Sequence, residues 1–339
     1  MRTFTMTAMA LALAVTATAA DAKPKHHPKS GMWINNIQGM GGDLNLKHVM
    51  PHTVAVTYPY KIVKVPHLDT PNLVELEQVN KGDMSATLKL NSYSASDVTG
   101  TAAAVGNTAN IETVDGVHVE GNQFNFGDGT ADLNGGKRYY RWYGYTVPAS
   151  VIGSTNVELT AAAIGNSANI EAGVESKSWY KPGADVQARL FQLNTGDMAA
   201  SLSADVHGYH MDSVDLTAAA VGNSINIQGT DDAVVGAHQI NAPGSKYYGR
   251  YIELDSDMRA YISGYGGEVA TTAASVGNSF SLEFGDSYDF AIAAIEQENF
   301  GDARAVNKTV LRGKFKKLDA TAAAIGNSIN ISNVLDSDS

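Results

Sequence analysis

The sequence predicts an all-β protein, a β-solenoid of about ten coils of roughly 23 residues with loop or hairpin insertions. Three observations lead to this fold class. One seven-residue phrase recurs five times, a second phrase alternates with it along the chain, and short segments beside both phrases alternate apolar and polar residues. Units that recur at a fixed spacing bury their apolar faces by stacking on their neighbours. The repeats therefore favour an extended surface over a single catalytic pocket.

The first phrase reads Thr-Ala-Ala-(Ala/Ser)-(Val/Ile)-Gly-Asn. Its copies are 101–107, 160–166, 217–223, 272–278 and 321–327. Three alanines alone favour a helix. The run is short, however, and stands directly before Gly-Asn in a strand-like frame, so we prefer strands in a narrow core to a helical repeat.

The second phrase is Gln-x-Asn, and it holds five of the chain's eight glutamines. Its glutamines are Gln78, Gln123, Gln192, Gln239 and Gln297. Four copies continue to Gly-Asp, whereas the fourth copy has Ala242-Pro243 in that place and is degenerate. Six of the nine steps between the two phrases span 22 to 25 residues, and the other three are longer. The spacing predicts a coil of roughly 23 residues, with insertions in the three long steps.

The local chemistry indicates strands. Residues 224–227 and 328–331 alternate polar and apolar side chains at period two, as half-buried strands do. Gly-Asn and Gly-Asp tolerate a positive φ, so we expect a sharp bend at each pair.

In-register stacking predicts columns of identical side chains. One column holds Asn107, Asn166, Asn223, Asn278 and Asn327, and alternate coils interleave Asp83, Asp128, Asp197 and Asp302. Such columns can form hydrogen-bonded ladders, as in amyloid. The alternative is that these residues are only good turn formers. Neither interpretation implies catalysis, and we predict no catalytic, cofactor-binding or metal-binding residue.

Composition and the two chain ends indicate where the protein acts and which kinds of partner it has. Residues 1–20 resemble a secretory signal peptide, 21–30 a basic flexible tail, 31–75 a β-rich leader, 76–332 the repeats, and 333–339 an acidic tail. A net charge of −11 argues against nucleic acid as a partner. The chain has no cysteine, so ladders and stacking must replace disulfides in a secreted protein at the bacterial cell surface or outer membrane. The last repeat ends near the C-terminus, which leaves an uncapped edge that can template another chain.

Aromatic residues gather in the three long steps. They are Tyr139, Tyr140, Trp142, Tyr143, Trp179, Tyr180, Tyr247, Tyr248 and Tyr251. With the neighbouring arginines and lysines they suit a glycan or a protein partner. The remaining alternative is that the rings pack on the solenoid itself.

The repeats resemble those of known bacterial surface proteins. Residues 78–86 and 192–200 are similar to the curlin repeat of curli fibres, and the Thr-Ala-Ala-Ala-Ile-Gly-Asn-Ser stretches are similar to curli-related holdfast attachment proteins. The resemblance covers about residues 78–332. It implies a structural role in anchoring an adhesive polysaccharide to the cell envelope. The aromatic insertions, the leader and the missing second glutamine of each coil differ from curlin and favour an anchor or nucleator over a homopolymer.

Two classes of function therefore compete. The first is a secreted adhesion protein that anchors or nucleates a curli-like or holdfast-like assembly by strand-edge stacking, with surface or fibre proteins, itself or polysaccharide as partners. The second is a polysaccharide-binding or polysaccharide-degrading β-helix. A degrading enzyme needs paired carboxylates on one face, and Asp255 and Asp257 are the near pair to test. A phage tail-fibre solenoid is disfavoured by the signal peptide.

Overall fold

The computed structural model describes residues 32–38, 72–140, 143–173, 185–229, 232–242, 252–284 and 291–333. The predicted signal peptide and basic tail lie outside these residues, as do 39–71 of the leader and 334–339 of the acidic tail. Every regular element in the described part is a β-strand, so the expected all-β class is confirmed. In this part of the chain no helix is long and apolar enough to cross a membrane.

The Gln-x-Asn phrases end the strands of one parallel sheet. In stacking order its strands are β1 (Met32–Gln38), β2 (Asn72–Asn80), β6 (Val117–Asn125), β12 (Val186–Asn194), β14 (Ala233–Asn241) and β16 (Ala291–Asn299). Each phrase pairs residue for residue with the next one along the stack.

The Thr-Ala-Ala-Ala-x-Gly-Asn phrases lie inside the long strands of a second sheet. Its strands are β3 (Met84–Lys89), β4 (Asn91–Tyr93), β5 (Asp97–Thr113), β7 (Gly129–Asn134), β10 (Ala149–Ile152), β11 (Asn156–Ala172), β13 (Met198–Gln228), β15 (Glu253–Phe284) and β17 (Asp302–Asn333). All strand pairs in this sheet are also parallel.

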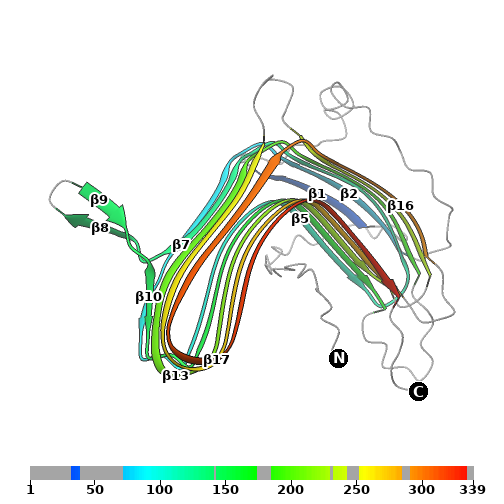
Figure 1. The fold of residues 1–339 in the computed structure, drawn as a ribbon. Coiled ribbons are helices and arrows are strands. Elements are labelled where there is room, and N and C mark those ends of the chain that lie inside the picture. The colour runs from blue at the N-terminus through cyan, green and yellow to red at the C-terminus, as the bar shows by residue number, and fades with distance from the viewer. Residues whose placement is uncertain are drawn as a thin grey trace, which may run out of the picture.

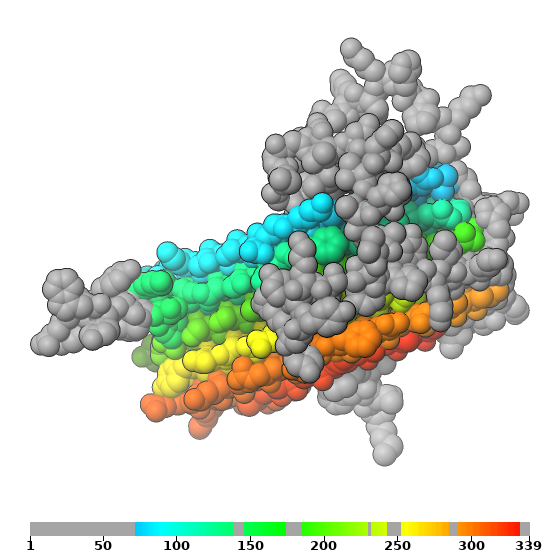
Figure 2. Space-filling view, turned by 90° about the horizontal axis from the view of Figure 1, so that it is seen from above, coloured from blue at the N-terminus to red at the C-terminus, as the bar shows by residue number. Residues whose placement is uncertain are grey.

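One strand of the first sheet and the following segments of the second form one layer of the stack. The five layers span 72–113, 117–172, 186–228, 233–284 and 291–333, and β1 adds to the first sheet ahead of layer 1. Viewed along the stack, each layer is bent at an apex and folded back on itself, so an inner strand runs beneath an outer one (Figure 1). The layers follow one another in chain order (Figure 2).

The expected coil length is wrong. Gln123 pairs with Gln78, 45 residues before it, and the next glutamines follow after 69, 47 and 58 residues. The two phrases therefore do not alternate up the stack as separate coils of about 23 residues. Both phrases lie in the same layer, one in the first sheet and one in the second. The chain runs through both sheets before it continues to the next layer.

Two apolar clusters fill the interior of the layers, and a third, smaller one lies on the opposite face of the first sheet. In one arm of the layers, alanines of the first phrase such as Ala161 and Ala163 on β11 belong to the same cluster as Ala131 and Leu133 on the outer strand β7 of their own layer. In the other arm, residues such as Ile170 and Val119 fill the space beneath the first sheet. The small alanine side chains allow the inner and outer strands of the second sheet to approach closely. The alanine run therefore belongs to a thin sandwich of strands, as expected, and not to a helix.

The glycine of Gly-Asn has a different role from the one predicted. Gly165 lies inside β11, and positive φ among the described glycines is confined to Gly136, Gly153, Gly173, Gly264 and Gly313. A Cβ on Gly165 would lie 2.5 Å from the carbonyl oxygen of Gly222 and 2.5 Å from Oδ1 of Asn194. The phrase therefore needs glycine because neighbouring layers approach closely there, and the sharp bend expected at Gly-Asn is absent.

Candidate functional site

The glutamines of the Gln-x-Asn phrase form a ladder inside the apex. Each side-chain amide donates to the glutamine oxygen of the preceding layer, over 2.6 Å from Gln123 to Gln78 and 2.7 Å from Gln297 to Gln239. The same Nε2 atom also donates across the layer to a backbone carbonyl of the long strand, as Gln192 does to Ser224 over 2.9 Å. The ladder therefore joins the layers to one another and joins the two sheets within each layer.

The asparagines of the same phrase form a second ladder with the opposite polarity. Asn80 donates to Asn125 over 2.7 Å, and the chain of bonds continues through Asn194 and Asn241 to Asn299. Asn194 and Asn241 are fully buried. Since a buried amide without partners is costly, each inner layer depends on the layers on both sides.

The predicted column of five asparagines is a third ladder. Asn107, Asn166, Asn223, Asn278 and Asn327 lie one above another, and each donates to the next over 2.7–2.8 Å. Asn107 also donates to the backbone carbonyl of Phe124 in the next layer, over 2.8 Å. These residues lie within strands and not at turns. The three ladders form a polar seam at the apex, between the two apolar clusters of the interior.

The aspartates form a separate column and do not interleave with the asparagines. Asp83 Oδ1 accepts the backbone N–H of Asp128 over 3.0 Å, and Asp128 Oδ1 accepts that of Asp197 over 2.9 Å. Asp197 in turn accepts from the backbone of Glu253, which stands opposite Asp302 in the register. The aspartates therefore hold the corner between the two sheets, from one layer to the next.

The C-terminal edge of the stack interrupts these patterns. In the described residues no strand pairs with the outer side of β16 or β17. The buried Oε1 atom of Gln297 has no hydrogen-bond partner, whereas the equivalent atom of Gln239 accepts from Gln297. The apolar columns are exposed to solvent at this edge. Ile227 is 0% exposed, whereas Ile331, two layers later in the same column, is 46% exposed. This edge combines unpaired strand backbone, a vacant amide acceptor and exposed apolar side chains.

The aromatic insertions are only partly described. β8 (Lys137–Tyr140) and β9 (Tyr143–Thr146) form an antiparallel hairpin that projects from the stack next to β7 and β10 (Figure 1). This hairpin carries Tyr139, Tyr140 and Tyr143. The other predicted aromatic contacts lie outside the described residues: Trp142, Trp179, Tyr180, Tyr247, Tyr248 and Tyr251.

The acidic pair singled out for an enzyme lies on β15. The Asp255 carboxylate is 3.2 Å from Arg304 on the neighbouring strand, and the Asp257 carboxylate is 2.6 Å from Arg259. Each carboxylate is thus paired with a guanidinium on the surface of the second sheet, in the manner of a solvated ion pair.

Sequence reasoning missed the ladders of the Gln-x-Asn phrase. The available signal was the period of two. Leu76 is buried in the core, and Gln78 and Asn80 follow it at steps of two, so all three side chains point to the same side of the strand. Polar residues that recur on the core side of a strand must find partners there.

Comparison with known protein families gives a match over the C-terminal part of the chain. A family model described as holdfast attachment protein D matches residues 143–339, which are 197 of the 339 residues. No curated protein and no solved structure matches the chain. The match covers more than half of the sequence and includes layers 3 to 5 with the open edge. The chain therefore belongs to the holdfast attachment protein D family.

Proposed function

We propose that this protein is a secreted anchor that binds an adhesive assembly through the C-terminal edge of its stack, formed by β16 and β17. Membership of the holdfast attachment family gives the chain an adhesion-related role at the cell surface or outside the cell. The observation that carries the proposal is the edge itself. Among the described residues no strand pairs with the outer side of this edge, and the edge continues the register that every earlier layer uses.

The partner consistent with this edge presents a parallel strand or a complete layer. An unpaired strand accepts an added strand through its backbone, and side-chain pockets select the sequence. A partner with glutamine in register would donate an amide to Gln297, as Gln297 donates to Gln239. Such a layer would also cover exposed apolar side chains such as Ile329 and Ile331. Full burial stabilises by about 1.5–3 kcal/mol for each such side chain.

The two ends of the stack differ, and this favours an anchor over a homopolymer. β1 already pairs with β2 at the N-terminal end of the first sheet. A second copy docking there with its C-terminal edge would have to displace β1, whereas a different surface or fibre protein meets no such obstacle at β16 and β17. Self-association remains the competing form of the same proposal, and neither form requires nucleic acid, a membrane span, a cofactor or catalysis.

A charged edge should abolish the attachment. Ile292 on β16 and Ile325 on β17 are 41% and 37% exposed, so lysine at both positions places two charges along the edge. Lysine on an edge strand opposes pairing with another strand. We expect at least a tenfold loss of partner binding, measured by cross-linking and copurification of surface complexes and by retention of the adhesive on washed cells.

The matched control places lysine on apolar side chains that are equally exposed but lie away from this edge. Leu73 on β2 and Ile152 on β10 are 37% and 39% exposed. Binding by the Leu73→Lys, Ile152→Lys variant should equal that of the wild type. Equal losses in both double variants, or no loss in the edge variant, would contradict the proposal. Filaments of the pure chain that respond to thioflavin would select the homopolymer.

A second candidate function is polysaccharide binding, favoured by the hairpin β8–β9, which projects from the stack and includes Tyr139, Tyr140 and Tyr143 (Figure 1). Tyrosine faces suit stacking on sugar rings. Replacing Tyr139, Tyr140 and Tyr143 by alanine should then weaken retention on acidic polysaccharide while leaving cross-linking at the edge intact. Degradation of the polysaccharide by the pure protein would revive the enzyme hypothesis with Asp255 and Asp257.

A further inference from the structure

A buried histidine on β14 has no hydrogen-bond partner. The His238 side chain is 6% exposed, and neither Nδ1 nor Nε2 makes a hydrogen bond. It stands between the inward-pointing core residue Ala237 and the ladder residue Gln239, so it lies on the opposite face of the first sheet. An unsatisfied buried imidazole is costly, and its presence calls for a ligand or a partner.

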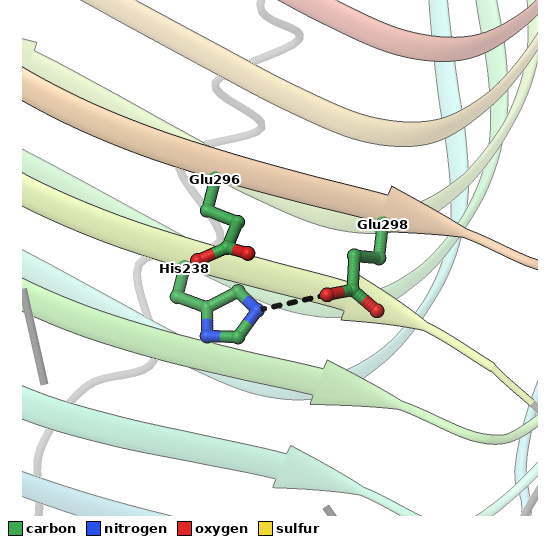
Figure 3. A group of neighbouring side chains, drawn as sticks. All are labelled: His238, Glu296 and Glu298. Atoms are coloured by element: carbon green, nitrogen blue, oxygen red, sulfur yellow. Dashed lines mark ion pairs between the residues drawn. The ribbon is translucent and has the colours of Figure 1, made fainter. Parts of the chain in front are cut away.

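Two glutamates of β16 face this imidazole. Glu296 is the register partner of His238, and Glu298 follows two residues later on the same face of the strand. Figure 3 shows both glutamate side chains extending from β16 toward the ring, with Nε2 of His238 3.8 Å from Oε1 of Glu298. One donor atom from each of the three side chains lies within 4.8 Å of the others.

Glu298 breaks the pattern of its own column. The preceding layers carry Val79, Phe124, Leu193 and Ile240 at this position, and all four belong to one apolar cluster. The Glu298 side chain is 38% exposed, so its carboxylate keeps contact with solvent while it lies 3.8 Å from the buried imidazole. A cation held by this carboxylate would give the unsatisfied imidazole a ligand bond.

We propose that His238, Glu296 and Glu298 bind a divalent transition-metal cation, with Zn²⁺ as the best match. Zn²⁺ takes imidazole nitrogen and carboxylate oxygen at about 2.0–2.2 Å, so tetrahedral ligands lie about 3.4 Å apart. The three donors lie within 4.8 Å of one another, so binding requires the side chains to draw closer together. One nitrogen ligand disfavours Ca²⁺ and Mg²⁺, which prefer oxygen ligands alone.

The site would join layers 4 and 5. His238 belongs to β14 and both glutamates belong to β16, so the metal cross-links the last two strands of the first sheet. A metal bound only in the folded state stabilises that state by mass action. The proposed metal site does not depend on what the edge binds. The sequence analysis predicted no metal-binding residue, because His238 and Glu296 are distant in sequence and come together only through the strand register.

A second histidine on the same sheet provides a matched control. His118 Nε2 is 3.2 Å from Glu120, and Arg189 of the next strand is 3.4 Å from the same carboxylate. There a guanidinium supplies the positive charge, which disfavours a metal ion. The two sites therefore share a histidine and a glutamate but differ in the third group.

The test is calorimetric titration of the metal-stripped full chain with Zn²⁺, compared with Ca²⁺ and Mg²⁺. His26 and His27 are replaced by glutamine in every variant, since adjacent histidines can also bind zinc. We expect one Zn²⁺ per chain. His238→Gln and Glu298→Gln should each weaken it at least tenfold, and His118→Gln should leave it unchanged. Bound zinc should also slow amide hydrogen exchange in β16 and leave β2 unchanged.

Glu298→Leu restores the apolar column, so it keeps the fold while removing a ligand, and it should show no zinc binding. Three results would overturn the proposal: no Zn²⁺ binding by the background chain, undiminished binding in both ligand variants, or tighter binding of Ca²⁺ or Mg²⁺ than of Zn²⁺.

Discussion

Layers 3 and 5 carry the same phrases in environments that differ. Asn194 and Asn223 of layer 3 are fully buried and bonded to the layers before and after them. In layer 5, Asn327 is exposed, and the Oε1 atom of Gln297 lacks a partner. A repeated motif therefore does not have a fixed energetic value. Its polar groups are satisfied only when the layers on both sides are present. The last copy therefore keeps a hydrogen-bond acceptor, Oε1 of Gln297, that is occupied in the inner copies.

The glycine of the first phrase should give the largest contrast between the two regions. Gly165→Ala places a methyl group 2.5 Å from the backbone of the next layer, whereas Gly326→Ala meets only Nδ2 of Asn299 at 3.3 Å. A rigid backbone neighbour cannot give way, so we expect a loss of about 3 kcal/mol or more for Gly165→Ala and less than about 0.5 kcal/mol for Gly326→Ala. Denaturant unfolding of both variants measures this, and equal losses would refute a difference between inner layer and edge.

The asparagine ladder should give the next largest contrast. Asn194→Leu keeps the volume but leaves the Nδ2 of Asn125 and the Oδ1 of Asn241 without their ladder partner. Each unsatisfied buried group costs about 1–3 kcal/mol, so we expect a loss of about 2–4 kcal/mol. Asn299→Leu interrupts the ladder on one side only and should cost about half as much. Thermal unfolding tests the ratio, and a larger loss for Asn299→Leu would contradict the argument.

A smaller, pH-dependent contrast is expected in one column of the second sheet. Burial raises the pKa of Asp215, and the negative charge of Glu158 on the paired strand adds to this effect, against a hydrogen bond from Thr217. The folded state then holds the proton more tightly than the unfolded state. Stability at this site falls as pH rises from the ordinary aspartate value through the raised pKa. Asp215→Asn should therefore stabilise the protein at neutral pH.

The increase in the free energy of unfolding of Asp215→Asn is at most about 1 kcal/mol after allowance for solvent screening. It should vanish at pH values below the ordinary pKa of an aspartate. Asp319 ends the same column on β17, 2.7 Å from Lys317 and exposed to solvent. Asp319→Asn should change stability little at any pH. Melting temperatures of the two variants between pH 3 and pH 8 make the comparison, and a loss of stability for Asp215→Asn at neutral pH would show that the aspartate is favourable there.

The sequence predicted strands, stacking and the column of Asn107, because identical phrases in a period-two frame leave few other arrangements. The predicted coil length of about 23 residues was wrong. Steps of nearly equal length suggest equal coils, but the spacing alone does not show whether two successive phrases lie in the same layer or in successive layers. That choice depends on which apolar faces meet, and the alanine faces fit opposite strands of their own layer.

The cluster of His238, Glu296 and Glu298 was beyond sequence reasoning for a related reason. No spacing rule links a histidine in one repeat to glutamates in the next until the register is known. Glu298 was nevertheless visible as the one charged residue at the middle of a Gln-x-Asn phrase. A departure from a repeat is thus as informative as the repeat itself.

The continuity of the long strands has a mechanical consequence. Hydrogen bonds between layers point along the stack, so tension on an anchor attached at its edge loads the bonds of each interface together. In layer 1 the second sheet is divided among β3, β4 and β5, and in layer 2 among β7, β10 and β11. From β13 onward one unbroken strand of 31 or 32 residues crosses the layer. Under the proposed attachment at β16 and β17, we expect resistance to pulling to increase along the chain and to be greatest next to that edge.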